Sequence, residues 1–327
     1  MLYWVFHGIS AHALSNALIS ASWPALVLGA AINLGHNVFR VLRWRWLLDP
    51  VRKSVPMRPM FVAVILGYMT SFVGGRVGEV VRPALLSARE GLPLGPCLGT
   101  VVADRLLDGA AFVALFAVGS MSAHFTVGSA DLAGKIRWTA VLALVAIVVG
   151  LIVLVAISTI GERLNFWLSR RWRVVRWAGH AALGLSRGAD ALRSPRRLVP
   201  IVAHSLLAWA TIGIGTWIGI RAAGADVGFA DVLVMLPLLA VGVSVPTPGG
   251  VGGYHVAMQF GLTKLFGVDP TIAASAGILM YLAIWIPILL LGSIMLFTER
   301  VSWSDLVAAA KQVRALGSAE GAVGAAR

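Results

Sequence analysis

Three ionisable residues follow a pair of glycines at a regular spacing. Arg76, Glu79 and Arg82 come after Gly74-Gly75, and a spacing of three places them on one face of a helix. Two arginines and one glutamate leave a net positive charge that suits a phosphate, because the carboxylate holds one guanidinium while the other makes bidentate hydrogen bonds. The alternative is a structural ion pair that fixes the segment.

A second ionisable group lies about twenty residues further on. Asp104 and Asp108 share a helix face at i, i+4, with Arg105 between them. The two carboxylates could bind a proton or a cation, or they could neutralise Arg76 or Arg82. We favour neutralisation. The sequence has no further carboxylate cluster and no His-x-x-x-His pair, so we expect neither a metal site nor a cofactor.

A third group lies in the proline- and glycine-rich stretch from Pro246 to His255. A helix that begins after this break would present unpaired amides and a positive dipole to an anion, and a histidine in its first turn could donate a hydrogen bond or carry a proton. The alternative for this histidine is an ordinary buried polar residue. The candidate ligand groups are Thr247, Gly249, Gly250, Gly252 and His255.

Composition indicates that all three groups lie in a membrane. The 327 residues are 58% hydrophobic and 13% charged. Apolar runs long enough to cross a bilayer lie at 23–46, 98–121, 138–160, 198–220 and 272–297. We therefore predict an all-α polytopic membrane protein with about five full spans. The net charge of +13 lies between spans and not in a soluble module, so we expect no nucleic-acid partner.

Loop charges predict the orientation of the spans. The segments 40–58 and 161–197 are rich in basic residues and are predicted to be cytoplasmic, whereas 122–137 and 221–231 are nearly balanced and fit the outside. The first segment sets six cations against Asp49 alone. These cations are Arg40, Arg43, Arg45, Arg52, Lys53 and Arg58.

The crossing count requires two segments that return to the side they left. The pieces 59–73 and 77–88, and the pieces 232–245 and 251–266, are each shorter than the roughly 20 residues of a spanning helix. We predict two re-entrant hairpins, broken at Gly74-Gly75 and at Pro246 to Gly253, that enter from opposite faces and together form a site. These hairpins are the one sequence indication of inverted repeats.

The chain is otherwise predicted to form one membrane domain, residues 1–300. Within it, 161–197 carries Trp167, Trp172 and Trp177 among arginines, a pattern typical of an interfacial helix. Residues 301–327 are predicted to be a partly disordered cytoplasmic tail. Met1 to Phe6 lacks a basic region before it, so we expect no signal peptide there.

Three motifs in order carry a family resemblance. Gly75-Arg76-Val77-Gly78-Glu79-Val80-Val81-Arg82-Pro83, Asp104-Arg105-Leu106-Leu107-Asp108 and Pro246-Thr247-Pro248-Gly249-Gly250-Val251-Gly252 together resemble the transmembrane, flippase-like region of the lysylphosphatidylglycerol synthase family, over roughly residues 23–297. The chain departs from the family pattern at Gly74, where proline is common, and at His255, where glutamate is common.

The resemblance implies a bacterial inner-membrane protein that moves a lipid or a lipid-linked head group between leaflets without hydrolysing ATP. The expected partner is a membrane lipid, anionic or phosphate-bearing. One alternative is a non-transporting partner of a lipid-modifying enzyme. Another is a lipid-carrier transferase that uses Asp104, Asp108 or His255 as a base. With no nucleotide or metal motif and no soluble aminoacyl-transferring domain, we expect no enzyme activity.

Overall fold

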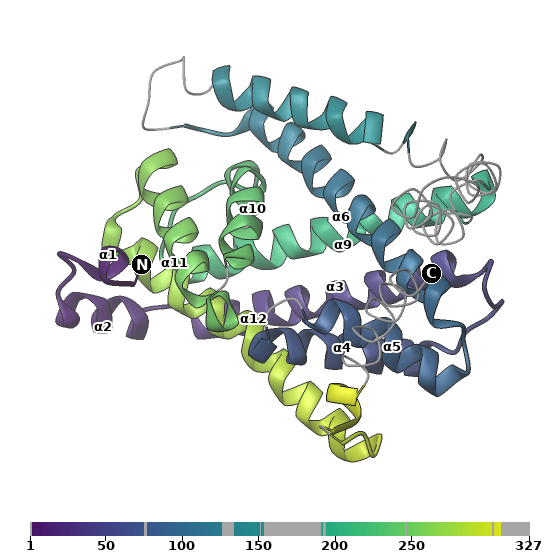
Figure 1. Ribbon diagram of the computed structural model, residues 1–327. Helices are drawn as coiled ribbons and strands as arrows, with labels where there is room; N and C mark the ends of the chain where they lie inside the picture. Colours follow the sequence, from purple (N-terminus) through teal and green to yellow (C-terminus); the bar gives the residue numbers. More distant parts are fainter. Residues whose placement is uncertain are drawn as a thin grey trace, which may run out of the picture. The chain divides into compact units, whose positions relative to one another are not determined.

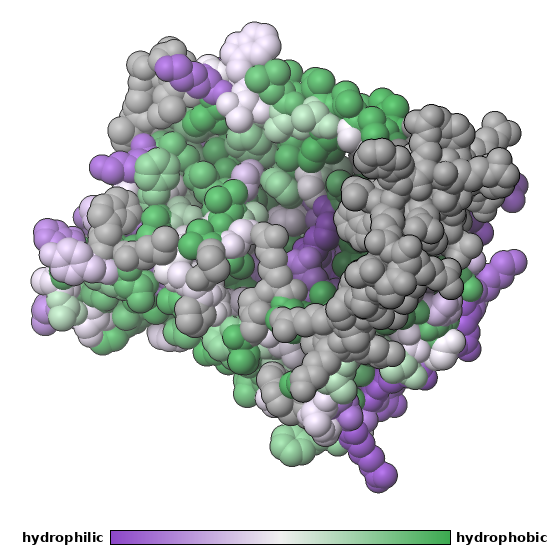
Figure 2. All heavy atoms as spheres, in the orientation of Figure 1, coloured by the Kyte–Doolittle hydropathy of each residue, from purple (hydrophilic) through white to green (hydrophobic). Residues whose placement is uncertain are grey.

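Helices make up almost the whole of the described chain. The computed structural model describes residues 2–74, 77–125, 134–150, 152–153, 191, 194–245, 247–302 and 304–308, and these contain no strand (Figure 1). Figure 2 shows hydrophobic side chains over much of the visible surface, as expected where helices face lipid and not water. The predicted all-α polytopic membrane class is confirmed.

The first group of helices ends at Ser122. It comprises α1 Leu2–Phe6, α2 Ala11–Ile19, α3 Trp23–Leu48, α4 Met57–Gly74, α5 Gly78–Glu90 and α6 Leu94–Ser122.

Residues 134–150 are also helical, and a second group of helices begins at Pro195. This group comprises α9 Pro195–Ala222, α10 Phe229–Ser244, α11 Val251–Phe260 and α12 Pro270–Thr298. A short 3-10 turn, Pro248–Gly250, precedes α11, and a π-helical turn, Gly261–Leu265, follows it.

Three of these helices are long and apolar enough to cross a membrane on length and composition. They are α3, α9 and α12, and they coincide with the predicted spans at 23–46, 198–220 and 272–297. Helix α6 has 29 residues and covers the predicted span at 98–121, although its first half carries ionisable side chains. The described helix at 134–150 covers the first part of the predicted span at 138–160.

The first predicted hairpin is present as two short helices, α4 with 18 residues and α5 with 13. The two helices pack directly on each other. At their contact, a methyl group added to Gly67 would lie 3.1 Å from the carbonyl oxygen of Gly78 and 3.2 Å from Cβ of Arg82. A methyl group on Gly78 would collide with the Gly67 carbonyl oxygen. The pair of glycines therefore sets how closely the arms approach.

The second predicted hairpin is also present, as α10 with 16 residues and α11 with 10. Between its arms, Gly249 and Gly250 have φ angles of 62° and 70°, which L side chains rarely adopt. A methyl group on Gly242 would lie 2.5 Å from the carbonyl oxygen of Gly253 and 2.8 Å from Cβ of Ala257. Glycines thus provide both the tight turn and the close contact.

The two hairpins share one packing register. Gly242, Gly253 and Ala257 follow Gly67, Gly78 and Arg82 by the same 175 residues (242 − 67, 253 − 78 and 257 − 82), and each triplet makes the equivalent contact. The helices around the hairpins also recur in order, with α3 to α6 matched by α9 to α12. This register supports the predicted internal repeat; its inverted orientation stays a prediction from the loop charges.

The chain divides into two compact units. Unit 1 comprises Met1–His36, Gly109–Ile147 and Leu206–Leu290, and unit 2 comprises Asn37–Asp108, Val148–Ser205 and Leu291–Arg327. The α10–α11 hairpin belongs to unit 1 and the α4–α5 hairpin to unit 2. That the two breaks face each other stays a prediction. Most of the predicted interfacial segment, including its three tryptophans, and the tail from residue 309 lie outside the described residues, and the last part of that segment, from Pro195, belongs to α9.

Candidate functional site

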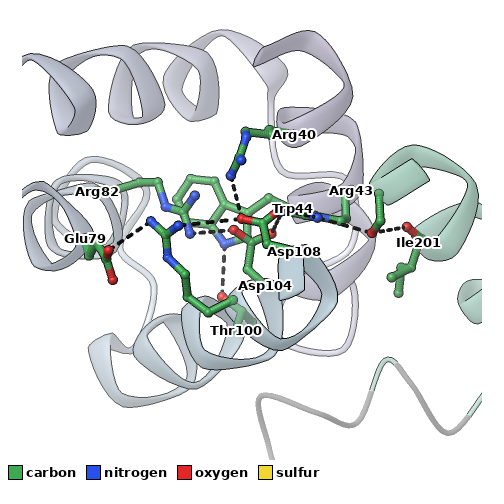
Figure 3. Close-up of polar contacts among 11 residues, drawn as sticks. Arg40, Arg43, Trp44, Glu79, Arg82, Thr100, Asp104, Asp108 and Ile201 are labelled. Carbon is green, nitrogen blue, oxygen red and sulfur yellow. Dashed lines mark hydrogen bonds and ion pairs between the residues drawn. The ribbon is translucent and has the colours of Figure 1, made fainter. Parts of the chain in front are cut away.

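An aspartate pair on α6 lies at the centre of a buried ion cluster in unit 2 (Figure 3). Asp104 and Asp108 are one helical turn apart, and both are almost completely buried. Arg43 of α3 reaches both carboxylates, at 2.6 Å from Asp104 Oδ1 and 2.9 Å from Asp108 Oδ1. Arg40, one turn earlier on α3, lies 2.7 Å from Asp108 Oδ2. Burying a charge costs several kcal/mol unless it is paired, so these contacts hold α3 against α6.

The α4–α5 hairpin joins the cluster through Arg82. Its Nη2 donates to Asp104 Oδ2 at 3.0 Å, and its guanidinium lies 4.7 Å from the ring centroid of Trp44. The Trp44 indole is fixed by a hydrogen bond of 3.0 Å from its Nε1 to Thr100 Oγ1 (Figure 3). This stacked, ion-paired geometry is the kind of site where lysine does not substitute for arginine. The pairing of Asp104 with Arg82 is the neutralisation favoured from the sequence.

The outer edge of the cluster is formed by Glu79 and Arg105. Arg105 lies 3.2 Å from Glu79 Oε1 and 3.6 Å from Asp108 Oδ2, and 40% of its side chain is exposed. These two residues and Arg82 line a small polar recess with Tyr68 and Ser71. Its volume of about 20 Å³ is the room that one water molecule needs. Arg105 is therefore the cation of the described cluster that is most accessible to a ligand.

The described cluster carries an excess of one positive charge. Its buried part sets three arginines against two aspartates, and its edge adds one arginine and one glutamate. A structural ion network would be complete with equal charges. The surplus cation is the feature that suits an anionic ligand. Arg76, which would add a further positive charge, lies outside the described residues.

Arg40 and Arg43 correct one sequence interpretation. They were counted among six cations of a cytoplasmic loop, but α3 continues to Leu48 and both side chains are buried. Four cations of that segment, Arg45, Arg52, Lys53 and Arg58, still outnumber Asp49. The excess of positive charge that predicts a cytoplasmic location for this segment therefore remains, but it is smaller than the sequence count suggested. The spacing of Arg40 and Arg43 could have indicated this pairing. Residues at i, i+3 share one helix face, as do Asp104 and Asp108 at i, i+4, so two such faces can meet as ion pairs.

The second candidate group surrounds the break in unit 1. His255 is buried, and its Nδ1 pairs locally with the Val251 carbonyl oxygen at 2.7 Å. Its ring lies 5.2 Å from that of Tyr281, whose hydroxyl donates to the Gly249 carbonyl oxygen at 2.9 Å. Tyr281, on α12, thus holds the turn in place, although no motif or spacing in the sequence singles it out.

Two hydroxyl groups near this break have no hydrogen-bond partner among the described residues. They are Thr247 Oγ1 and Tyr254 Oη, and both atoms are buried. Buried polar groups are nearly always satisfied, so each indicates a position for water or a ligand group. Gly250 and Gly252 are placed at the start of α11, as expected. The predicted residues of this group therefore gather at the break, which belongs to unit 1, whereas the ion cluster belongs to unit 2.

The fold and the two polar groups define a class of protein: an all-helical, polytopic membrane protein with paired broken hairpins and a buried ion cluster. The family model of the lysylphosphatidylglycerol synthase TM region matches residues 1–292, so the chain belongs to that family. The UPF0104 membrane protein MJ1595 of Methanocaldococcus jannaschii is 28% identical over 111 residues. That alignment covers 32% of this chain and 32% of the relative.

Proposed function

We propose that this protein moves a polar or anionic lipid, or a lipid-linked head group, between the leaflets of a membrane without catalysing a reaction. The observation that carries the proposal is the surplus positive charge buried beside the α4–α5 hairpin. Ionisable groups at membrane depth are costly and usually mark a ligand site or a pathway. A phosphate near Arg82 and Arg105 would balance the cluster.

The proposed path begins at the α4–α5 hairpin. The head group contacts Arg82 and Arg105 there, while its acyl tails stay in lipid. Further contacts with Arg76, and with Thr247 and the amides of Gly249 to Gly252 at the second break, stay predictions from the sequence. Rocking of one repeat against the other would expose the head group to each side in turn, as in transporters built from inverted repeats. The setting we propose is the bacterial inner membrane, with the loop after α3, residues 49–58, and the segment 161–197 in the cytoplasm.

The alternatives receive less support from the site. A lipid-carrier transferase would need a base, but Asp104 and Asp108 are already held by arginines, and Nδ1 of His255 is paired with its own helix. A non-transporting partner of a lipid-modifying enzyme would not require the surplus charge.

A reconstituted flipping assay tests the proposal. Purified protein in liposomes is supplied with fluorescent phosphatidylglycerol, and dithionite quenching reports the fraction that reaches the inner leaflet over time. Arg105→Gln should lower the rate for this anionic probe by about tenfold or more, because it removes a charge-assisted contact of roughly 1.5–3 kcal/mol. Arg105 is partly exposed, so the variant is expected to fold.

Arg52→Gln is the matched control. Arg52 is also an exposed arginine of unit 2 paired with a glutamate, Glu90 at 3.3 Å, but it lies outside the cluster. Its rate should stay at the wild-type value. Equal rates for Arg105→Gln and wild type, in protein of equal thermal stability, would refute the role assigned to the cluster.

A further inference from the structure

An apolar groove lies in unit 2, apart from the ion cluster. It is open along one side, has a volume of about 440 Å³, and is formed by α3, α4 and α12. Such a volume is in the range of sites that bind small ligands, roughly 300–1,000 Å³. Its apolar walls include Val38, Val41, Phe61, Val62, Leu291 and Ile294.

One end of this groove carries charge. Arg58, at the start of α4, and Glu299, just after α12, both line it, and their Nε and Oε1 atoms are 2.9 Å apart. Arg89, at the end of α5, also donates to the Glu299 carboxylate, at 3.1 Å. Burial raises the pKa of the Glu299 carboxyl, but hydrogen bonds from Arg58 and Arg89 lower it by more, so the pKa lies below its ordinary value. With Glu299 ionised, Arg58, Glu299 and the neighbouring Arg89 together carry a net charge of +1.

We propose that this groove binds one anionic phospholipid, with an acyl chain between α3, α4 and α12 and the phosphate against Arg58. The Arg58 side chain is 79% exposed, which leaves its Nη groups accessible. Along α12 the groove runs from Leu291 to Glu299, which is about 12 Å at roughly 1.5 Å per residue. That length fits inside the hydrocarbon of one leaflet, about 15 Å, or half of a bilayer core.

The polarity of the groove favours a lipid over a peptide or a soluble ligand. Its charges occur at the ends of α4 and α12, where these helices meet the head-group region, and its walls toward the membrane interior are apolar. Ile294 and Val38 are 56% and 45% exposed, although they lie within candidate spans. This site is separate from the proposed transport path, so binding can be tested without measuring flipping.

Photolabelling of the full chain tests the site. The protein is reconstituted in vesicles of phosphatidylcholine with a minor fraction of phosphatidylglycerol that carries a diazirine near the end of one acyl chain. After irradiation, mass spectrometry locates the labelled peptides. We expect labelling of residues 61–62 and 291–294, which line the groove away from its charged end, and its loss in Ile294→Trp, whose indole fills the groove. Arg58→Gln should weaken labelling about two- to fivefold, as expected for an exposed charge contact.

Matched variants separate this site from general lipid contact. Leu290→Trp adds the same ring one turn earlier on α12, at a residue that is 60% exposed and does not line the groove, and it should leave labelling unchanged. Arg52→Gln should also leave it unchanged. Equal labelling in Ile294→Trp and wild type would overturn the proposal. Equal labelling by a phosphatidylcholine probe would also overturn it, because the site would then not select an anionic head group. Labelling that appears only after deletion of 309–327 would likewise overturn it, because the tail and not a lipid would then occupy the groove.

Discussion

At the scale of single residues, Arg43 connects the buried charges. It is fully buried, and it contacts both aspartates of α6 and Ser205 of α9. Arg82 and Arg40 each contact one aspartate. Removing Arg43 would therefore leave both carboxylates with fewer partners in a setting where unpaired charge is costly.

We predict that Arg43→Met destabilises the protein by about 3–5 kcal/mol, the typical cost of breaking a buried ion pair from one side. Thermal unfolding in detergent, followed by the loss of helical circular dichroism, measures the effect. Arg45→Met is the control: Arg45 is only half-buried and no ion pair joins it to the cluster, so its effect should stay within about 0.5 kcal/mol. Similar losses for the two variants would show that the cluster does not stabilise the fold.

At the scale of elements, the hairpins depend on close contact between their arms. Gly67 faces Gly78 in one hairpin, and Gly242 faces Gly253 in the other, at equivalent positions. Arg82 and Ala257 occupy matching places beside these contacts. The same glycine contact therefore packs both hairpins. The residue beside it is the ionisable Arg82 in the α4–α5 hairpin and the apolar Ala257 in the α10–α11 hairpin.

Gly78→Ala and Gly253→Ala should each destabilise the protein by about 1–3 kcal/mol, because the added methyl group collides with a backbone carbonyl and overpacks the hairpin. The same unfolding assay applies. Gly35→Ala provides the comparison, since a methyl group there meets nothing within 4 Å and α3 should gain roughly 0.5–1 kcal/mol. Hairpin variants as stable as Gly35→Ala would contradict the close packing.

At the scale of the whole molecule, the repeated helix order and the loop charges together predict a topology. If α3 runs toward the cytoplasm and α9 away from it, the two repeats are inverted and their hairpins enter from opposite faces. The loop charges alone give this direction, and the correction of Arg40 and Arg43 leaves four cations in support of it.

Cysteine labelling of intact cells tests this topology. The one native cysteine, Cys97, is buried and is replaced by alanine. A membrane-impermeant maleimide should then label Lys135→Cys, within the predicted outside loop 122–137, without permeabilisation. Arg52→Cys should react only after permeabilisation. The opposite pattern would reverse the assigned orientation, and equal reaction of both residues from one side would exclude inverted repeats.

Sequence patterns are enough to predict the helical class, the long spans and the two broken hairpins. These features are local: hydropathy and length define a span, and glycine and proline mark where a helix breaks. The expected arms at 59–73 and 77–88 agree with α4 and α5, and each predicted end lies within two residues of the observed end. The aspartate pair was also identified, because i, i+4 spacing fixes a shared helix face.

Which charged side chains meet could not be predicted from the sequence, because it depends on how distant helices pack. Arg40 lies 68 residues from Asp108 along the chain. Its position beside other basic residues predicted a side chain exposed in a loop, and not one buried against an aspartate. Trp44 beneath Arg82 and Tyr281 beside Gly249 likewise come from separate helices. Spacing along one helix shows which side chains share a face, but the face of a second helix that packs against it depends on contacts across the fold.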